Sequence, residues 1–332
     1  MKTNPLLPRI TVVLGAALAL VTGGCAAART CAATAHPPPA GSTSAVRPYQ
    51  ATAADGTCLQ AYEWKPASGH VVGAVVIVHG IRDHASRYAA LADALTAKGL
   101  AVYAQDMRGH GDSGGDKQRF DSLPQLVADT DLAVEEARKL NPGVPVFVYG
   151  HSLGGLISTH YALAHGDKLR GLVLSGPALK LFPSVTDGQK GAARFFSGIL
   201  PGLPAQEVDD TQFVREEAAK KDLASDPLVY HDNLPARSAA AALDGIDEVQ
   251  KRMGELKVPV LILHGSADKA TNPEGSKELK ERAATADKTL HIYEGVFHDL
   301  LHEPERAQII QEVVGWITAR LGPANASARA SR

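Results

Sequence analysis

The sequence predicts one α/β domain with a mostly parallel central sheet, helices on both faces and an inserted cap. Short apolar, β-branched runs alternate with helix-length segments, which is typical of a parallel sheet covered on both faces. The alternation lapses once, over about residues 177–255, and we interpret this segment as a cap above the carboxyl edge of the sheet. With 332 residues, 45% of them apolar, the chain is long enough for one domain with such an insertion.

The elements of this domain are expected in order between residues 49 and 321. Residues 49–64 alternate around Asp55-Gly56, a turn signal that predicts two antiparallel strands. The other elements are bounded by glycine, proline and asparagine. The predicted strands are 71–78, 100–105, 144–149, 171–174, 258–263 and 289–293. The predicted helices are 88–98, 124–140, 153–163, 273–284 and 304–321.

The first 25 residues have the pattern of an export signal. Lys2 and Arg9 precede an apolar run, 10–21, which is shorter than the about 20 apolar residues that a membrane-spanning helix needs. Small residues then lead directly into Cys25, which resembles a bacterial lipoprotein signal with Cys25 as the lipidated residue. The alternative is ordinary cleavage near residues 26–28. We therefore expect a protein of the bacterial cell envelope, lipid-anchored to a membrane, or otherwise secreted or periplasmic.

Two further segments and two cysteines bear on how the domain is attached. Residues 26–48 are rich in Ala, Pro, Ser and Thr and predict a flexible tether, and 322–332 predict a flexible tail. An exported protein permits a disulfide between Cys31 and Cys58, but two cysteines do not require one. Cys58 is also interpretable as a small packed residue in a strand.

The charge and aromatic content give no basis for nucleic-acid binding. The formal net charge is -2 and only 5% of residues are aromatic, so neither a basic surface nor stacking platforms are expected.

A serine follows the predicted strand 144–149 in the segment Gly150-His151-Ser152-Leu153-Gly154. A serine between a buried strand and a helix lies on a tight turn that exposes its hydroxyl at the carboxyl edge of the sheet. The glycines two before and two after it leave room for the strand and helix to approach. This placement predicts that Ser152 is a nucleophile.

A serine nucleophile needs a base and an orienting carboxylate, which follow it here in the chain order serine, acid, histidine. Asp268 follows the predicted strand 258–263, and His298 follows the predicted strand 289–293. The sequence therefore predicts a Ser152–His298–Asp268 triad.

The acid and the base of the triad each have an alternative interpretation. Asp268 is a possible helix cap, although Asn272 is better placed for that role. His302 is a second candidate base, but it stands at the start of the last helix rather than at a strand end. Asp299 is expected to be a solvated neighbour or a loop cap.

The oxyanion of an acyl-transfer intermediate needs two backbone N–H donors. One is expected from Leu153, directly after the nucleophile, and the other from Ile81, in the loop after the predicted strand 71–78. His79 is expected to pack or hydrogen-bond under that loop. This chemistry requires no metal and no organic cofactor.

Several segments together resemble the monoacylglycerol lipase branch of the α/β-hydrolases, the serine aminopeptidase S33 or hydrolase-4 group. They occur in order between about residues 49 and 321, and the segments 79–88 and 225–229 are more specific to this group than the others. The segments are 79–88 (HGIRDHASRY), 106–113 (DMRGHGDS), 150–155 (GHSLGG), 225–229 (SDPLV), 264–268 (HGSAD) and 295–300 (GVFHDL).

The resemblance implies the α/β-hydrolase fold, the triad Ser152, Asp268 and His298, and the oxyanion donors Ile81 and Leu153. It also implies a serine hydrolase that cleaves carboxylic esters, with monoacylglycerol or another lipid ester as substrate. Leu153 departs from the methionine usual in this group, a mild change because the backbone acts there. The enzymatic alternatives are a lysophospholipase or a general carboxylesterase, and the alternative of another class is a non-catalytic envelope lipoprotein that uses the fold as a binding module.

Apolar pairs in the cap bear on the substrate. They are expected either to meet an acyl chain or lipid surface, as a mobile lid, or to hold the cap onto the core, and core packing is favoured for any single residue. These residues are Leu181, Phe182, Phe195, Phe196, Ile199, Leu200 and Leu203.

Overall fold

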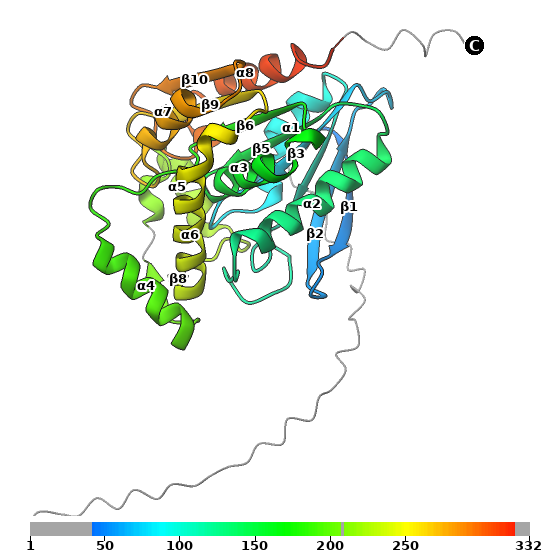
Figure 1. Cartoon of the computed structure of the whole chain (residues 1–332). Helices are drawn as coiled ribbons and strands as arrows, with labels where there is room; N and C mark the ends of the chain where they lie inside the picture. The colour runs from blue at the N-terminus through cyan, green and yellow to red at the C-terminus, as the bar shows by residue number, and fades with distance from the viewer. Residues whose placement is uncertain (1–41, 207–208, 323–332) are drawn as a thin grey trace, which may run out of the picture.

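The computed structural model describes residues 42–206 and 209–322, which form an eight-stranded sheet with helices on both faces and a cap (Figure 1). The strands of this sheet are β1 (Ala45–Thr52), β2 (Cys58–Lys65), β3 (Gly73–Val78), β4 (Leu100–Gln105), β5 (Val146–His151), β6 (Gly171–Ser175), β9 (Val260–Gly265) and β10 (Lys288–Tyr293). The helices are α1 (Ala89–Thr96), α2 (Leu123–Leu140), α3 (Leu153–His165), α4 (Asp187–Ile199), α5 (Glu217–Ser225), α6 (Ala236–Arg252), α7 (Pro273–Arg282) and α8 (Arg306–Thr318). Two short cap strands, β7 (Pro204–Gln206) and β8 (Leu234–Pro235), pair with each other.

The strand order in the large sheet is β1-β2-β4-β3-β5-β6-β9-β10. The hairpin β1–β2 is antiparallel, and β2 joins β4 in antiparallel register. From β4 to β10 every neighbouring pair is parallel. Because parallel strands end at one edge, the loops after β3, β5, β9 and β10 meet there.

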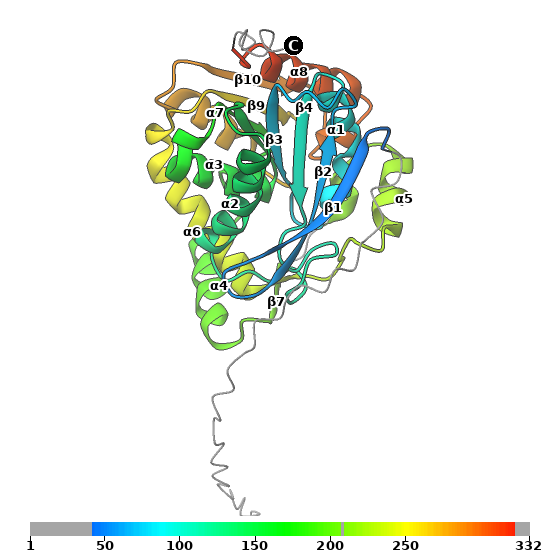
Figure 2. The same cartoon turned by 90° about the vertical axis from the view of Figure 1, so that its right-hand side faces the viewer.

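The central strands β3, β4, β5, β6 and β9 are buried on both faces, which explains why they are mainly apolar rather than alternating. Val76 and Val148 face the core formed with α2, α3, α6 and α7. Their chain neighbours Ile77 and Tyr149 face the opposite core, formed with α1 and α8. Figure 2 shows α2 and α3 on one side of the strands and α1 on the other. The strands and helices predicted for this part of the fold are confirmed, with bounds shifted by a few residues.

The N-terminal hairpin corrects two sequence-based interpretations. Strand β1 begins at Ala45, so the last residues assigned to the tether 26–48 belong to the sheet. Pro48 is unfavourable within most strands and therefore hid this extension of β1 in the sequence. A proline is tolerated there because β1 is the edge strand. Cys58, at the start of β2, is disulfide-bonded rather than a free packed thiol, and its partner cysteine lies outside the described residues. The signal segment 1–25, with Cys25, and the tail after residue 322 also lie outside them.

The segment 177–255, where the predicted alternation of strands and helices lapses, is largely helical. It contains α4, α5 and α6, and α6 belongs to the core, because Ala239, Ile246 and Val249 are buried among the side chains of α2 and α3. The backbone of α6 approaches closely enough for the Gly245 carbonyl to accept a hydrogen bond from His160 Nε2 at 2.9 Å. The apolar residues of α6 recur at helical spacing, so this helix was predictable from the sequence and was overlooked.

Candidate active site

The serine turn has the strained backbone that the sequence predicts. Ser152, directly after β5, has φ 55° and ψ -120°, a conformation that costs a non-glycine residue about 1–3 kcal/mol. Its N–H donates to the Ser175 carbonyl at 3.0 Å, which ties the turn to β6. A Cβ on Gly154 would lie 2.1 Å from the Val78 carbonyl oxygen, so only glycine lets α3 start this close to the end of β3.

The predicted acid and base are in direct contact. His298 Nδ1 lies 2.7 Å from Asp268 Oδ2, and both side chains are buried. An ionised carboxylate only accepts hydrogen bonds, so Nδ1 carries the proton and Nε2 is left to act as a base. Ser152 and His298 both line one cavity at the carboxyl edge.

The electrostatics of this pair are set by burial and by the attraction between the two groups. Burial would raise the pKa of the Asp268 carboxyl, but the charge of His298 and hydrogen bonds from His264 and His298 hold that pKa well below its usual range. Burial would likewise lower the pKa of His298, but the charge and hydrogen bond of Asp268 raise it above its ordinary 6.5.

Asp268 is held by further donors that sequence reasoning missed. Its Oδ1 accepts from the N–H groups of Ala270 at 2.7 Å and Thr271 at 2.9 Å. Its Oδ2 accepts from Thr271 Oγ1 at 2.8 Å, and His264 Nε2 lies 3.1 Å away. The signal for the two backbone donors was local, because an aspartate commonly accepts from N–H groups two or three residues later. The contact with His264 was not local.

The alternatives weighed for base and acid have other partners. His302 Nδ1 lies 2.8 Å from Asp299 Oδ1, so His302 pairs with Asp299 rather than with Asp268. Asp299 is not a solvated neighbour: its side chain is 11% exposed and accepts from Arg87 Nη2 at 2.8 Å. Asn272 caps α7, as expected, and accepts from the N–H of Glu274 at 3.1 Å.

The loop after β3 places Ile81 beside the serine. A Cβ on Gly80 would lie 2.9 Å from the Cβ of Ser152, and Ile81 lines the same cavity as Ser152 and Leu153. His79 supports this loop from below, as expected: its Nδ1 lies 2.7 Å from the Gly80 carbonyl, and its Nε2 accepts from the N–H of Met107 at 2.8 Å. Burial lowers the pKa of His79 to about 3, so the ring is neutral and serves as a support.

The cavity at the carboxyl edge has a volume of about 350 Å³, within the range that small-molecule sites occupy. It lies between the serine turn and the segment 177–255, and most of the residues of that segment that line it are apolar. These include Leu181, Phe182, Val185, Phe213, Leu234, Leu243 and Ile246.

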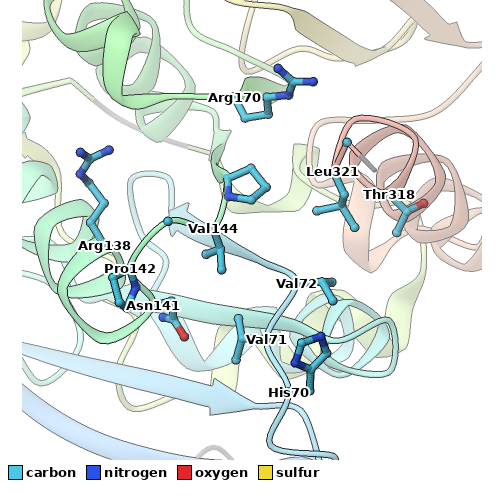
Figure 3. Close-up of a pocket in the computed structure, with 13 residues that line it drawn as sticks. His70, Val71, Val72, Arg138, Asn141, Pro142, Val144, Arg170, Thr318 and Leu321 are labelled. Carbon is cyan, nitrogen blue, oxygen red and sulfur yellow. The ribbon is translucent and has the colours of Figure 1, made fainter. Parts of the chain in front are cut away.

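A larger cavity of about 1010 Å³ lies elsewhere, where the loop before β3 meets the ends of α2 and α8 (Figure 3). The described residues that line this cavity include Arg138 and Arg170, and none of them is a predicted site residue. Within residues 42–206 and 209–322 there is no cluster of side chains able to hold a metal ion. The helices of that same part of the chain are all too short or too polar to cross a membrane.

A model of the family described as Hydrolase_4 (serine aminopeptidase, S33) matches residues 69–305, more than half of the chain. The chain belongs to this family. The monoacylglycerol lipase of Mycolicibacterium smegmatis is 34% identical over 249 residues, which cover 75% of this chain and 89% of that protein. The monoglyceride lipase of Homo sapiens is 34% identical over 274 residues, which cover 82% and 90%.

A solved structure agrees with this membership. The monoacylglycerol lipase of Paleococcus ferrophilus matches with a TM-score of 0.72 and 31% identity, covering 82% of this chain and 99% of its own. The α/β-hydrolase fold and the family resemblance predicted from the sequence are therefore confirmed. The chain is a monoglyceride lipase-like Hydrolase_4 protein, and it is an ester hydrolase.

Proposed function

We propose that this chain is a serine lipase that hydrolyses monoacylglycerol to fatty acid and glycerol through an acyl-enzyme. The single observation that carries this proposal is the buried Asp268–His298 hydrogen bond of 2.7 Å beside a strained Ser152 in one cavity. The choice of monoacylglycerol as the ester rests on the relatives, which are named monoacylglycerol or monoglyceride lipases.

The first step is acylation of the serine. His298 Nε2 takes the proton of Ser152 as the hydroxyl oxygen attacks the ester carbonyl, and Asp268 stabilises the imidazolium that forms. The N–H groups of Ile81 and Leu153 stabilise the negative oxygen of the tetrahedral intermediate. The carbon–oxygen ester bond breaks, and His298 returns its proton to the departing glycerol oxygen. Water then attacks the acyl-enzyme by the same route and releases the fatty acid.

The cavity supports a lipid acyl chain as substrate. Its apolar cap residues would remove an alkyl chain from water, which stabilises binding by about 0.8 kcal/mol for each buried CH₂ group. We assign the acyl chain to Leu181, Phe182 and Val185, which line the cavity together with Ser152.

A second candidate, lysophospholipase activity, is favoured by one observation. Lys180 and Lys269 also line the cavity, and an ammonium group there would attract the phosphate of a lysophospholipid. Lys180 is paired with Glu278, so Lys269 is the better candidate for this contact.

The experiment that separates these activities is a substrate panel. Fatty-acid release is measured from monoacylglycerols of several chain lengths, from lysophosphatidylcholine and from short-chain esters. We expect the highest kcat/KM with a monoacylglycerol. A higher value with lysophosphatidylcholine, reduced by Lys269→Gln, would establish the second candidate instead. Failure of a fluorophosphonate probe to label Ser152 would favour the non-catalytic binding module.

We also propose that Cys25 is lipidated and anchors the protein to a membrane of the bacterial cell envelope. The sequence before Cys25 supports this, and so does the outer face of α4. Phe195 is 63% exposed and Ile199 is 60% exposed, so they do not hold the cap to the core. Phe196, Leu200 and Leu203 are exposed as well. An exposed apolar face of this kind suits a lipid surface.

The anchor is tested by detergent phase partitioning of the full chain expressed in bacteria. We expect the wild type in the detergent phase and Cys25→Ser in the aqueous phase. Partition of both proteins into the aqueous phase would favour ordinary signal cleavage and a secreted or periplasmic enzyme.

A further inference from the structure

Three residues other than glycine have positive φ within the described part of the chain: Ser152, Arg82 at 55° and Gln118 at 54°. Such conformations persist only where the surrounding structure enforces them, and they cluster at functional sites. The serine turn explains Ser152. Arg82 and Gln118 belong to two different loops of the core, and neither is part of the proposed triad.

The side chains of Arg82 and Gln118 hold the same point of the cap. Arg82 Nη2 donates to the carbonyls of His231 and Asp232, both at 2.9 Å. Gln118 Nε2 donates to the same Asp232 carbonyl, also at 2.9 Å. Arg82 is 3% exposed and Gln118 is 1% exposed, so these bonds are shielded from water.

Arg82 makes an additional bond that Gln118 lacks. Its Nη1 lies 2.6 Å from Asp210 Oδ1, and the other oxygen of Asp210 lies 2.6 Å from His231 Nδ1. The planar guanidinium therefore joins two stretches of the cap, one at residue 210 and one at 231–232. Arginine suits this position because its fork presents several donors in fixed directions.

The cap segment that Arg82 holds also contacts the general base. Phe213 follows Asp210 by three residues, and its ring centroid lies 5.3 Å from that of His298. The Phe213 carbonyl accepts from the N–H of Asp299, the residue after His298, at 2.8 Å. The segment 210–213 therefore contacts Arg82, the residue after Ile81, through Asp210, and it contacts the His298 ring through Phe213.

We propose that Arg82 is a positioning residue that couples the cap to the geometry of catalysis. Through its bond to Asp210, Arg82 holds the segment 210–213 in place, and this fixes the Ile81 donor loop and the His298 ring relative to each other. This inference rests on the proposed function, because Ile81 and His298 act as donor and base there. Arg82 is not one of the reacting groups of the proposed mechanism.

The test uses a matched pair of variants, Arg82→Gly and Gln118→Gly. Glycine adopts positive φ freely, so each change removes the cap contact without leaving backbone strain. Arg82→Lys is the conservative variant, because an ammonium can reach Asp210 but cannot reproduce the guanidinium fork. All variants are prepared as the full chain and compared by thermal unfolding and fluorophosphonate labelling. Steady-state kinetics use p-nitrophenyl acetate, whose short acyl group needs little of the cap.

We expect Arg82→Gly to lower kcat about 10- to 100-fold with little change in KM, because a misplaced oxyanion donor acts only on the transition state. Arg82→Lys should recover part of this loss. Gln118→Gly should loosen the cap without moving the donor loop, so with this substrate kcat should fall by less than about threefold and KM should change little.

Two results would overturn the inference. One is a kcat for Arg82→Gly within about threefold of wild type. The other is an equal loss of kcat in both glycine variants, which would make the contacts a structural attachment of the cap. A wild type that neither cleaves p-nitrophenyl acetate nor reacts with fluorophosphonate would instead refute the proposed function. Activity and labelling of the wild type are therefore measured before any variant is compared.

Discussion

Asparagine in place of Asp268 would keep the shape of the site while removing the charge that orients His298. Oδ1 accepts from two backbone N–H groups, those of Ala270 at 2.7 Å and Thr271 at 2.9 Å, so the asparagine oxygen should take that position. The amide NH₂ would then face His298 Nδ1, where Oδ2 now lies at 2.7 Å. A donor at this place favours the tautomer with its proton on Nε2, which cannot accept the proton of Ser152.

The expected loss follows from that tautomer. Mispairing a buried, charge-assisted contact costs several kcal/mol, and the same change in other serine triads lowers kcat about 10⁴-fold. We expect kcat of Asp268→Asn to fall about 10³- to 10⁴-fold, equivalent to about 4 to 5.5 kcal/mol. KM should change little, because the carboxylate does not contact the substrate.

The pH profile gives the second readout. His298 must be neutral to act as a base, and Asp268 raises its pKa above 6.5, so wild-type activity should fall as the pH drops through that raised value. Without the Asp268 carboxylate the strongest influence that raises this pKa is gone, while burial still lowers it and only the charges of Asp299 and Asp83 still raise it, so the acid limb should move to lower pH. The assay is kcat against pH with a p-nitrophenyl ester.

A fall in kcat of less than about tenfold, or an acid limb that does not move, would refute this reasoning. Asp299→Asn is the control. Asp299 also raises the pKa of His298 through its charge, but its carboxylate contacts Arg87 and His302. Its acid limb should move slightly in the same direction, with kcat reduced by less than about tenfold.

Three further changes test the support of the site and the cap. Arg87→Met leaves the buried Asp299, 2.8 Å from the guanidinium, without its cation, and should lower the free energy of unfolding by about 3–5 kcal/mol in denaturant titrations; a change below about 1 kcal/mol would contradict this. Gly154→Ala places a Cβ 2.1 Å from a carbonyl oxygen at the end of β3, and should abolish fluorophosphonate labelling or folding; an active, folded variant would show that α3 can shift. Serine in place of Phe195 and Ile199 should reduce co-sedimentation with phospholipid vesicles, with circular dichroism as the folding control, and unchanged binding would exclude α4 from a lipid surface.

Features encoded by short stretches of sequence were predictable. The buried strands are β-branched runs because the sheet is covered on both faces, so their pattern is visible without the fold. The serine turn is likewise local, since Ser152 and Gly154 lie within a few residues. Asp268 and His298 were found because the end of a parallel strand fixes where its loop emerges, and that edge is shared.

Features that depend on distant partners were not predictable. Asp299 resembles a solvated loop residue in sequence, and only the fold brings Arg87, 212 residues away, against it. The helix α6 is a different case, because its apolar residues recur at helical spacing and the sequence alone could have indicated it. Strand β1 was cut short at Pro48 because its place at the edge of the sheet is a tertiary fact.

The proposed mechanism is tested most directly by the identity of the residue that becomes acylated. The purified protein is treated with a fluorophosphonate, digested and analysed by mass spectrometry, and hydrolysis of a monoacylglycerol is measured in parallel for wild type and Ser152→Ala. We predict a single adduct on the peptide containing Ser152, and loss of both adduct and hydrolysis in the variant. Monoacylglycerol hydrolysis retained by Ser152→Ala, or an adduct at another residue, would contradict the proposed mechanism.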